Sequence, residues 1–142
     1  MSKRLLVMAA LALFAVGTGY ADQSRTKVTI PVNKTAPTSG KQMYTNYCTP
    51  CHGADGKGHG QYAPILKRQP VDLSTLSKNN RGRFPETHIV SALQFGSAVA
   101  PRGTDEMPAW GPILGKMNQT NPQEVLLRIS NLSRYLETLQ LK

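Results

Sequence analysis

The residues with the clearest chemistry lie at positions 48–52, where the chain reads Cys-Thr-Pro-Cys-His. Two thiols three residues apart, followed at once by an imidazole, form the pattern by which a c-type haem is attached. At the end of a helix, Cys48 and Cys51 reach two vinyl groups on one edge of the porphyrin and form thioether bonds. His52 is then carried beneath the ring, where its imidazole binds the metal. The pattern predicts one covalently attached haem c and its iron.

Three other kinds of site use the same residue types. A structural zinc site needs a second pair of ligands, for which only His59 and His88 remain. A thioredoxin-like redox pair follows a strand in an alternating β/α chain, which this sequence lacks. A plain disulfide has no use for the loop at residues 53–60, which contains four glycines. Haem attachment is therefore the preferred interpretation.

The second axial ligand of the iron has to come from elsewhere in the chain. Met107 lies 55 residues beyond His52, in a passage long enough to cross to the opposite face of the ring, and Pro108 stiffens the chain after it. A soft thioether sulfur binds ferrous iron well and raises its reduction potential. We expect Met107 to be this ligand. The other candidates are Met43, Met117, His59 and His88.

Three helices are expected to position these residues. The first begins at Ser39, which has capping-box spacing with Gln42, and runs into the attachment pattern. The second starts near Pro85 and stops at Gly96. The third follows the cap Asn121, and it has an apolar stripe of about four turns. That stripe consists of Val125, Ile129, Leu132, Leu136 and Leu139.

The rest of the chain reads as loops. Residues 97–121 are rich in glycine and proline and are expected to be irregular. We expect residues 22–38 to form a polar, loosely ordered arm, although alternation at residues 28–32 hints at a strand. Residues 39–142 then form the domain. The expected fold is all-α, with about three main helices and long loops wrapped around one haem.

The N-terminus has the pattern of a secretory signal peptide. Lys3-Arg4 precedes an apolar run of 12 residues, Leu5–Val16, and Gly19 and Ala21 supply small residues before a cleavage site. The run is shorter than the roughly 20 residues of a membrane-spanning helix. We therefore expect residues 1–21 to be removed and the mature chain to be periplasmic, without a stable membrane span. An uncleaved anchor is the alternative.

Composition limits the remaining classes. The chain has 142 residues, 18% charged and 39% hydrophobic, which fits neither a disordered chain nor a membrane bundle. Its net charge of +9 falls to +7 when Lys3 and Arg4 leave with the signal peptide. Two cysteines exclude a multi-disulfide scaffold and the iron–sulfur cages, which need four thiolates.

Beyond the attachment pattern, several segments occur in the order seen in one known family. They are Gly40, Met43-Tyr44, residues 48–53, residues 107–110 and residues 132–136. Together they resemble the class I bacterial cytochromes c over residues 39–142. The resemblance implies that the first and last helices cross, with Gly40 and Tyr44 meeting Tyr135. It also implies that the Pro64 carbonyl accepts a hydrogen bond from the axial imidazole, and Trp110 is expected to donate to a haem propionate.

The function expected of such a protein is periplasmic one-electron transfer with His52 and Met107 as axial ligands, because both positions on the iron are then filled. One alternative is a haem c subunit of a larger oxidoreductase, such as a dehydrogenase or terminal oxidase. Catalysis at the haem is a third possibility, and it requires a vacant or weakly held sixth position.

The positive charge suits redox partner proteins with acidic docking surfaces, whereas an ordinary solvated basic surface is the competing interpretation. Nucleic acid is not expected as a partner of an exported chain. Eight basic residues are expected in loops near the haem edge. They are Lys57, Lys67, Arg68, Lys78, Arg81, Arg83, Arg102 and Lys116.

Overall fold

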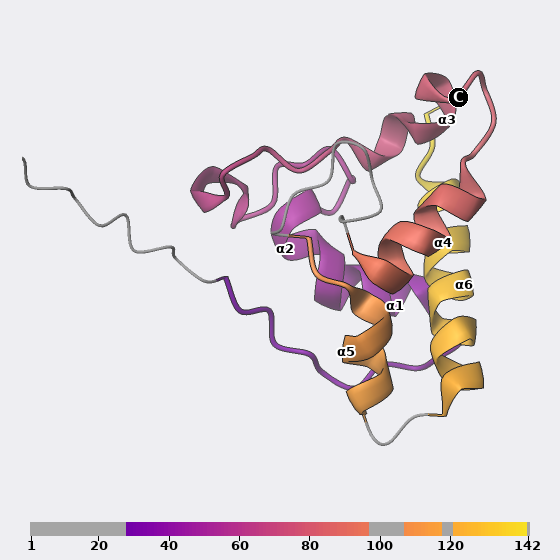
Figure 1. The fold of residues 1–142 in the computed structure, drawn as a ribbon. Helices are drawn as coiled ribbons and strands as arrows, with labels where there is room; N and C mark the ends of the chain where they lie inside the picture. The colour runs from indigo at the N-terminus through magenta and orange to yellow at the C-terminus, as the bar shows by residue number, and fades with distance from the viewer. Residues whose placement is uncertain (1–27, 97–106, 118–120, 142) are drawn as a thin grey trace, which may run out of the picture.

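A computed structural model describes residues 28–96, 107–117 and 121–141. Every regular element in these ranges is helical, in agreement with the expected all-α fold (Figure 1). The signal-peptide prediction and Arg102 lie outside the described residues. Within the described ranges, no helix has both the length and the apolar character needed to cross a membrane.

The first helix runs without a break from residue 40 to residue 52. It consists of α1 (Gly40–Met43), a π-helical segment η1 (Tyr44–Cys48) and α2 (Thr49–His52). Ser39 caps it as predicted, because its hydroxyl accepts a hydrogen bond from the Gln42 backbone N–H at 3.2 Å. The reciprocal bond of a capping box, from the Ser39 N–H to the Gln42 side chain, is not the one that Gln42 makes. Its side chain instead accepts from the Ala36 N–H at 2.8 Å, which ties the preceding chain to the helix start.

The other two predicted helices are also present. They are α4 (Glu86–Phe95), which ends at Gly96 with a φ of 77°, and α6 (Pro122–Thr138). The Asn121 side chain accepts a hydrogen bond from the Glu124 N–H at 2.8 Å and so caps α6. The apolar stripe of α6 faces the core: Val125, Ile129, Leu132 and Leu136 are all buried.

The crossing of the first and last helices is confirmed. Gly40 lies so close to α6 that an added Cβ would collide with the Asn131 carbonyl oxygen and would come within 2.8 Å of the Tyr135 Cβ. One turn later, the rings of Tyr44 and Tyr135 pack with their centroids 5.3 Å apart. The lack of a side chain at residue 40 therefore sets how closely the two helix backbones approach.

The longest helix that was not predicted is α5 (Trp110–Lys116). It lies in the passage expected to be a loop and packs against α4 and α6 (Figure 1). Its sequence, Trp-Gly-Pro-Ile-Leu-Gly-Lys, carries two glycines and a proline, which obscure the helical signal. Tertiary packing overrides this poor propensity, because Trp110 and Leu114 bury their side chains in the core.

Short helical turns hold the segment between the attachment pattern and α4. They are η2 (Ala63–Ile65), η3 (Leu73–Thr75) and α3 (Leu76–Asn79). The C-terminal residues fix this segment to the end of α6: the Gln140 side chain donates to the Leu73 carbonyl at 2.7 Å and accepts from the Ser77 N–H at 2.8 Å.

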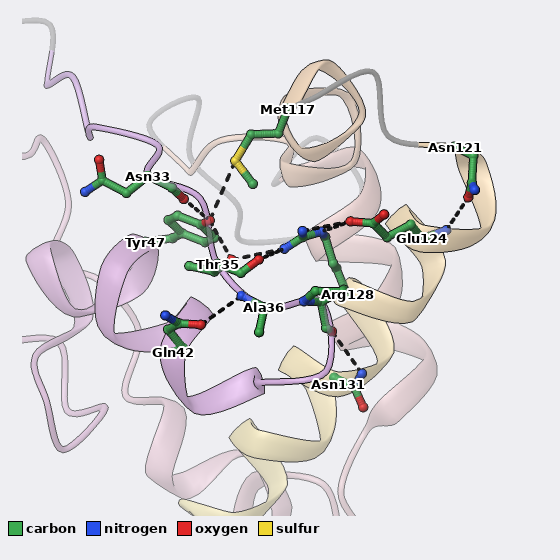
Figure 2. A network of polar contacts seen from close by, with 11 residues as sticks. Asn33, Thr35, Ala36, Gln42, Tyr47, Met117, Asn121, Glu124, Arg128 and Asn131 are labelled. Carbon is green, nitrogen blue, oxygen red and sulfur yellow. Dashed lines mark hydrogen bonds and ion pairs between the residues drawn. The ribbon is translucent and has the colours of Figure 1, made fainter.

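Residues 28–38 differ from the loose arm that was expected. They have no regular structure, but Ile30 and Val32 pack against the core and Thr35 is buried. The guanidinium of Arg128 donates to the carbonyl and the hydroxyl oxygens of Thr35 at 2.9 and 3.0 Å (Figure 2). Glu124 balances the buried guanidinium charge at 2.7 Å. We call residues 30–37 the N-terminal strap.

Candidate functional site

Cys48, Cys51 and His52 lie together at the C-terminal end of the first helix. Cys48 is the last residue of the π-helical segment and is buried, Cys51 is partly exposed in α2, and no disulfide joins them. His52 ends α2 and is only 7% exposed. A spacing of three residues puts the two sulfurs on neighbouring turns of one helix face. This placement suits two bonds to one edge of a flat group.

The His52 imidazole is oriented by a backbone carbonyl. Its Nδ1 lies 3.2 Å from the Val71 carbonyl oxygen, and because a carbonyl only accepts, Nδ1 carries the proton. Burial lowers the pKa of His52, and the hydrogen bond to Val71 partly opposes this shift. The Val71 carbonyl thus fixes the orientation of the ring, and Nε2 is the nitrogen that this hydrogen bond does not use.

The predicted carbonyl partner was wrong. Pro64 was expected to accept from the imidazole, but Pro64 is an exposed residue of the short turn η2, and Val71 takes this role. The chain reaches Val71 because the Leu73 N–H bonds to the Gly56 carbonyl at 2.7 Å. Asp72 fixes the next turn: both the hydroxyl and the N–H of Ser74 donate to its carboxylate, and the hydroxyl bond is the main cause of a lowered Asp72 pKa.

The glycine-rich loop folds back on the attachment helix. The Gly58 N–H donates to the His52 carbonyl at 2.8 Å and the Gly60 N–H donates to the Cys51 carbonyl at 3.0 Å. A Cβ at Gly60 would lie 2.5 Å from the Thr49 carbonyl oxygen, and one at Gly58 would collide with the Pro70 carbonyl. These glycines therefore allow a close approach to the protein's own backbone. It satisfies the carbonyls at the end of α2.

The buried Cys48 thiol is poorly suited to disulfide exchange. Its pKa is raised to about 12, first by burial and second by the neighbouring Cys51. Thiol–disulfide exchange needs a thiolate and therefore a lowered pKa. The thioredoxin-like alternative does not agree with this environment.

The environment of Trp110 also bears on whether these residues fit a haem. Its side chain is 2% exposed, and its ring stacks on Tyr47 with centroids 5.2 Å apart. Among the described residues, no acceptor lies within reach of its buried indole Nε1–H. A buried donor of this kind needs an acceptor, and a haem propionate supplies one. The unpartnered N–H therefore fits the expected group.

Met107 lies just before α5, partly buried, and packs against the hydrophobic core. Sequence reasoning missed two residues around the site. Val71 contributes a backbone carbonyl, which has no sequence signature. Tyr47 was not predicted to lie at the site, although it contacts Trp110 and Met117.

A helical fold with crossing terminal helices, a Cys-x-x-Cys-His pattern and a histidine oriented by a backbone carbonyl together define a c-type cytochrome domain. It carries covalently bound haem c with its iron, and such a domain transfers electrons. Residues 35–122 match the family described as cytochrome C oxidase, cbb3-type, subunit III, and the chain belongs to that family. A search of curated proteins gave no match to the sequence.

Proposed function

We propose that the protein is a periplasmic one-electron carrier in which His52 and Met107 are the axial ligands of a single haem c. The observation that carries the proposal is the hydrogen bond from His52 to Val71, which leaves Nε2 as the ligand atom beside the two cysteines. When bound, the haem iron supplies a one-electron couple between its ferrous and ferric states. The protein's own residues orient the imidazole and exclude water from it, because His52 is buried.

The other candidates for the second axial ligand of the iron lie in surroundings that do not suit this role. Met43 is fully buried on the attachment helix itself, and the sulfur of Met117 lies 3.7 Å from the Tyr47 hydroxyl. His59 and His88 are both exposed, the latter on α4. Met107 precedes α5 and is partly buried, which supports its assignment as the ligand.

The ligand assignment is tested by replacing Met107 with leucine, with Met117→Leu as the matched control. Wild-type and control proteins are expected to show a Met methyl resonance strongly shifted by the haem ring current in the reduced state, and Met107→Leu is expected to lose it. Its reduction potential should also fall, because the thioether stabilises ferrous iron. Persistence of the shifted resonance in Met107→Leu would assign the ligand elsewhere.

We also propose that residues 1–21 are a cleaved signal peptide and that residues 39–142 form the cytochrome domain, preceded by the segment 22–38. Haem attachment through thioethers takes place outside the cytoplasm, which agrees with the export pattern of the sequence. The contacts of Thr35 with Arg128 mean that the part of this segment nearest the domain is packed on it.

The second candidate function is a haem subunit of a terminal oxidase, and the family match favours it. A carrier and a subunit use the same haem, so the two functions differ only in assembly. Isolation of the native protein under mild conditions separates them, because a carrier is recovered as a single chain whereas a subunit is recovered with its catalytic partner.

We propose that the partner has an acidic docking surface. Of the eight basic residues expected near the haem edge, the seven within the described ranges are exposed. Lys78 lies in α3 and Lys116 ends α5, so these two are not in loops as predicted. Lys67 and Arg68 lie in the loop that returns to the attachment helix: the Tyr62 N–H in that loop donates to the Pro50 carbonyl at 2.9 Å. The positive charge of this loop attracts anionic partners.

This proposal predicts salt-dependent electron transfer. Raising the ionic strength from about 0.01 M to about 0.15 M should slow oxidation of the reduced protein by ferricyanide about tenfold, because the Debye length shortens. Substituting Lys67→Gln and Arg68→Gln should weaken this dependence more than Lys78→Gln, since α3 lies away from α2 (Figure 1). A rate that does not change with salt contradicts the docking proposal and leaves electron transfer itself untouched.

A further inference from the structure

We propose that Tyr47 is a positioning residue that couples the haem-attachment helix to the segment carrying Met107. The inference rests on the proposed function, because it takes Met107 as the axial ligand. It arises from a single observation: one side chain, next to Cys48 in sequence, contacts both ends of α5.

The contact at the N-terminal end of α5 is an aromatic stack. Trp110 is the first residue of α5, and its ring lies 5.2 Å from that of Tyr47 at an interplanar angle of 23°. Both side chains are almost completely buried, at 2% and 1% exposure. Met107 precedes Trp110 by three residues, and Pro108 restricts the backbone between them. Movement of Trp110 is therefore transmitted to Met107 through a short, stiff connection.

The contact at the C-terminal end of α5 involves the phenol. Met117 follows the last helical residue, and its sulfur lies 3.7 Å from the Tyr47 hydroxyl (Figure 2). The side chain of Tyr47 thus touches both ends of a helix of seven residues, which is too short to be stable alone. The placement of α5 depends on what it packs against, and Tyr47 is part of that surface.

The N-terminal strap and α6 fix the phenol itself. The hydroxyl donates to the Asn33 carbonyl at 2.6 Å, and it accepts from the Thr35 hydroxyl at 2.8 Å. Thr35 in turn accepts from Arg128, whose charge is balanced by Glu124. Figure 2 shows this chain of contacts running from α6 through the strap to Tyr47. The hydroxyl protons of Tyr47 and Thr35 each have an acceptor, so the ring is held in one orientation.

Such a residue controls how often Met107 releases the iron. Loss of the stack allows α5 and the segment before it to separate from the attachment helix more readily. Aromatic pairs of this kind shift an equilibrium by up to about tenfold. We expect Tyr47→Leu to increase the rate at which cyanide binds the ferric protein about tenfold, because cyanide enters only after Met107 leaves. Tyr47→Phe retains the ring and should show a smaller increase.

Tyr44 provides the matched control. It is equally buried in the same π-helical segment, but its ring packs on Tyr135 of α6 and its hydroxyl donates to the Gly53 carbonyl at 2.7 Å. Tyr44→Leu should destabilise the fold as much as Tyr47→Leu in urea unfolding, yet cyanide binding should stay near the wild-type rate.

The outcomes separate the two proposals. If the wild-type protein lacks the ring-current-shifted methionine resonance, or if Met107→Leu keeps it, the proposed ligation fails and this inference fails with it. If that resonance is assigned to Met107 but Tyr47→Leu binds cyanide no faster than Tyr44→Leu, the ligation stands and the positioning role of Tyr47 is wrong. A selective increase in Tyr47→Leu, with a partial increase in Tyr47→Phe, supports the role.

Discussion

Gly40→Ala is expected to destabilise the holoprotein by about 3 kcal/mol or more, which is the upper end of the range for overpacked cores. A Cβ at this position meets two groups that cannot move independently: the Asn131 carbonyl oxygen and the Tyr135 Cβ, which would be 2.8 Å away. Both belong to consecutive turns of α6, so relief requires the whole helix to shift. That shift would also separate the Tyr44 and Tyr135 rings.

The measurement is urea unfolding of the two proteins, with Gly115→Ala as the control. Gly115 lies inside α5, and a Cβ there meets only Val125 Cγ2 at an ordinary 3.8 Å. Alanine is a better helix former than glycine by about 1 kcal/mol, so this variant should be unchanged or more stable. Equal stability of Gly40→Ala and wild type would show that the helices cross with more room than the structure gives them.

Local sequence signals predicted the elements that start and stop by local chemistry. The side chains of Ser39 and Asn121 each accept a hydrogen bond from a backbone N–H three residues later in the chain. Short sequence patterns predict this capping geometry. Gly96 ends α4 with a positive φ, again a local property. The crossing at Gly40 is a contact between distant elements, and it was available only through family resemblance.

The surroundings of the site depend on contacts that leave no local pattern. Val71 acts through its carbonyl, which any residue could supply, and the family resemblance implied Pro64 instead. The helix α5 contains residues that disfavour helices, and it is stabilised by burial of Trp110. The strap is irregular, yet a buried Arg128 on a distant helix fixes it at Thr35. From sequence alone, a charged residue such as Arg128 is expected at the surface, because the partners that allow its burial are distant in the chain.

Replacing both Cys48 and Cys51 by alanine is expected to have the largest effect of all: complete loss of covalently held haem. The double variant can retain haem only through ligation, so denaturation should release all of it, whereas the wild-type protein should keep it. Co-production with the maturation machinery, followed by mass spectrometry under denaturing conditions, measures this directly. A haem-sized mass increment on the double variant would contradict the assignment of the two thioethers.

The single variants distinguish attachment from ligation. Cys48→Ala and Cys51→Ala each leave one thiol, so each should retain haem after denaturation at a lower yield. His52→Ala keeps both thiols but removes the oriented imidazole, so its haem should remain attached while its spectrum changes from low-spin to high-spin. A colourless His52→Ala variant would mean that the histidine is needed for attachment as well as for binding the iron.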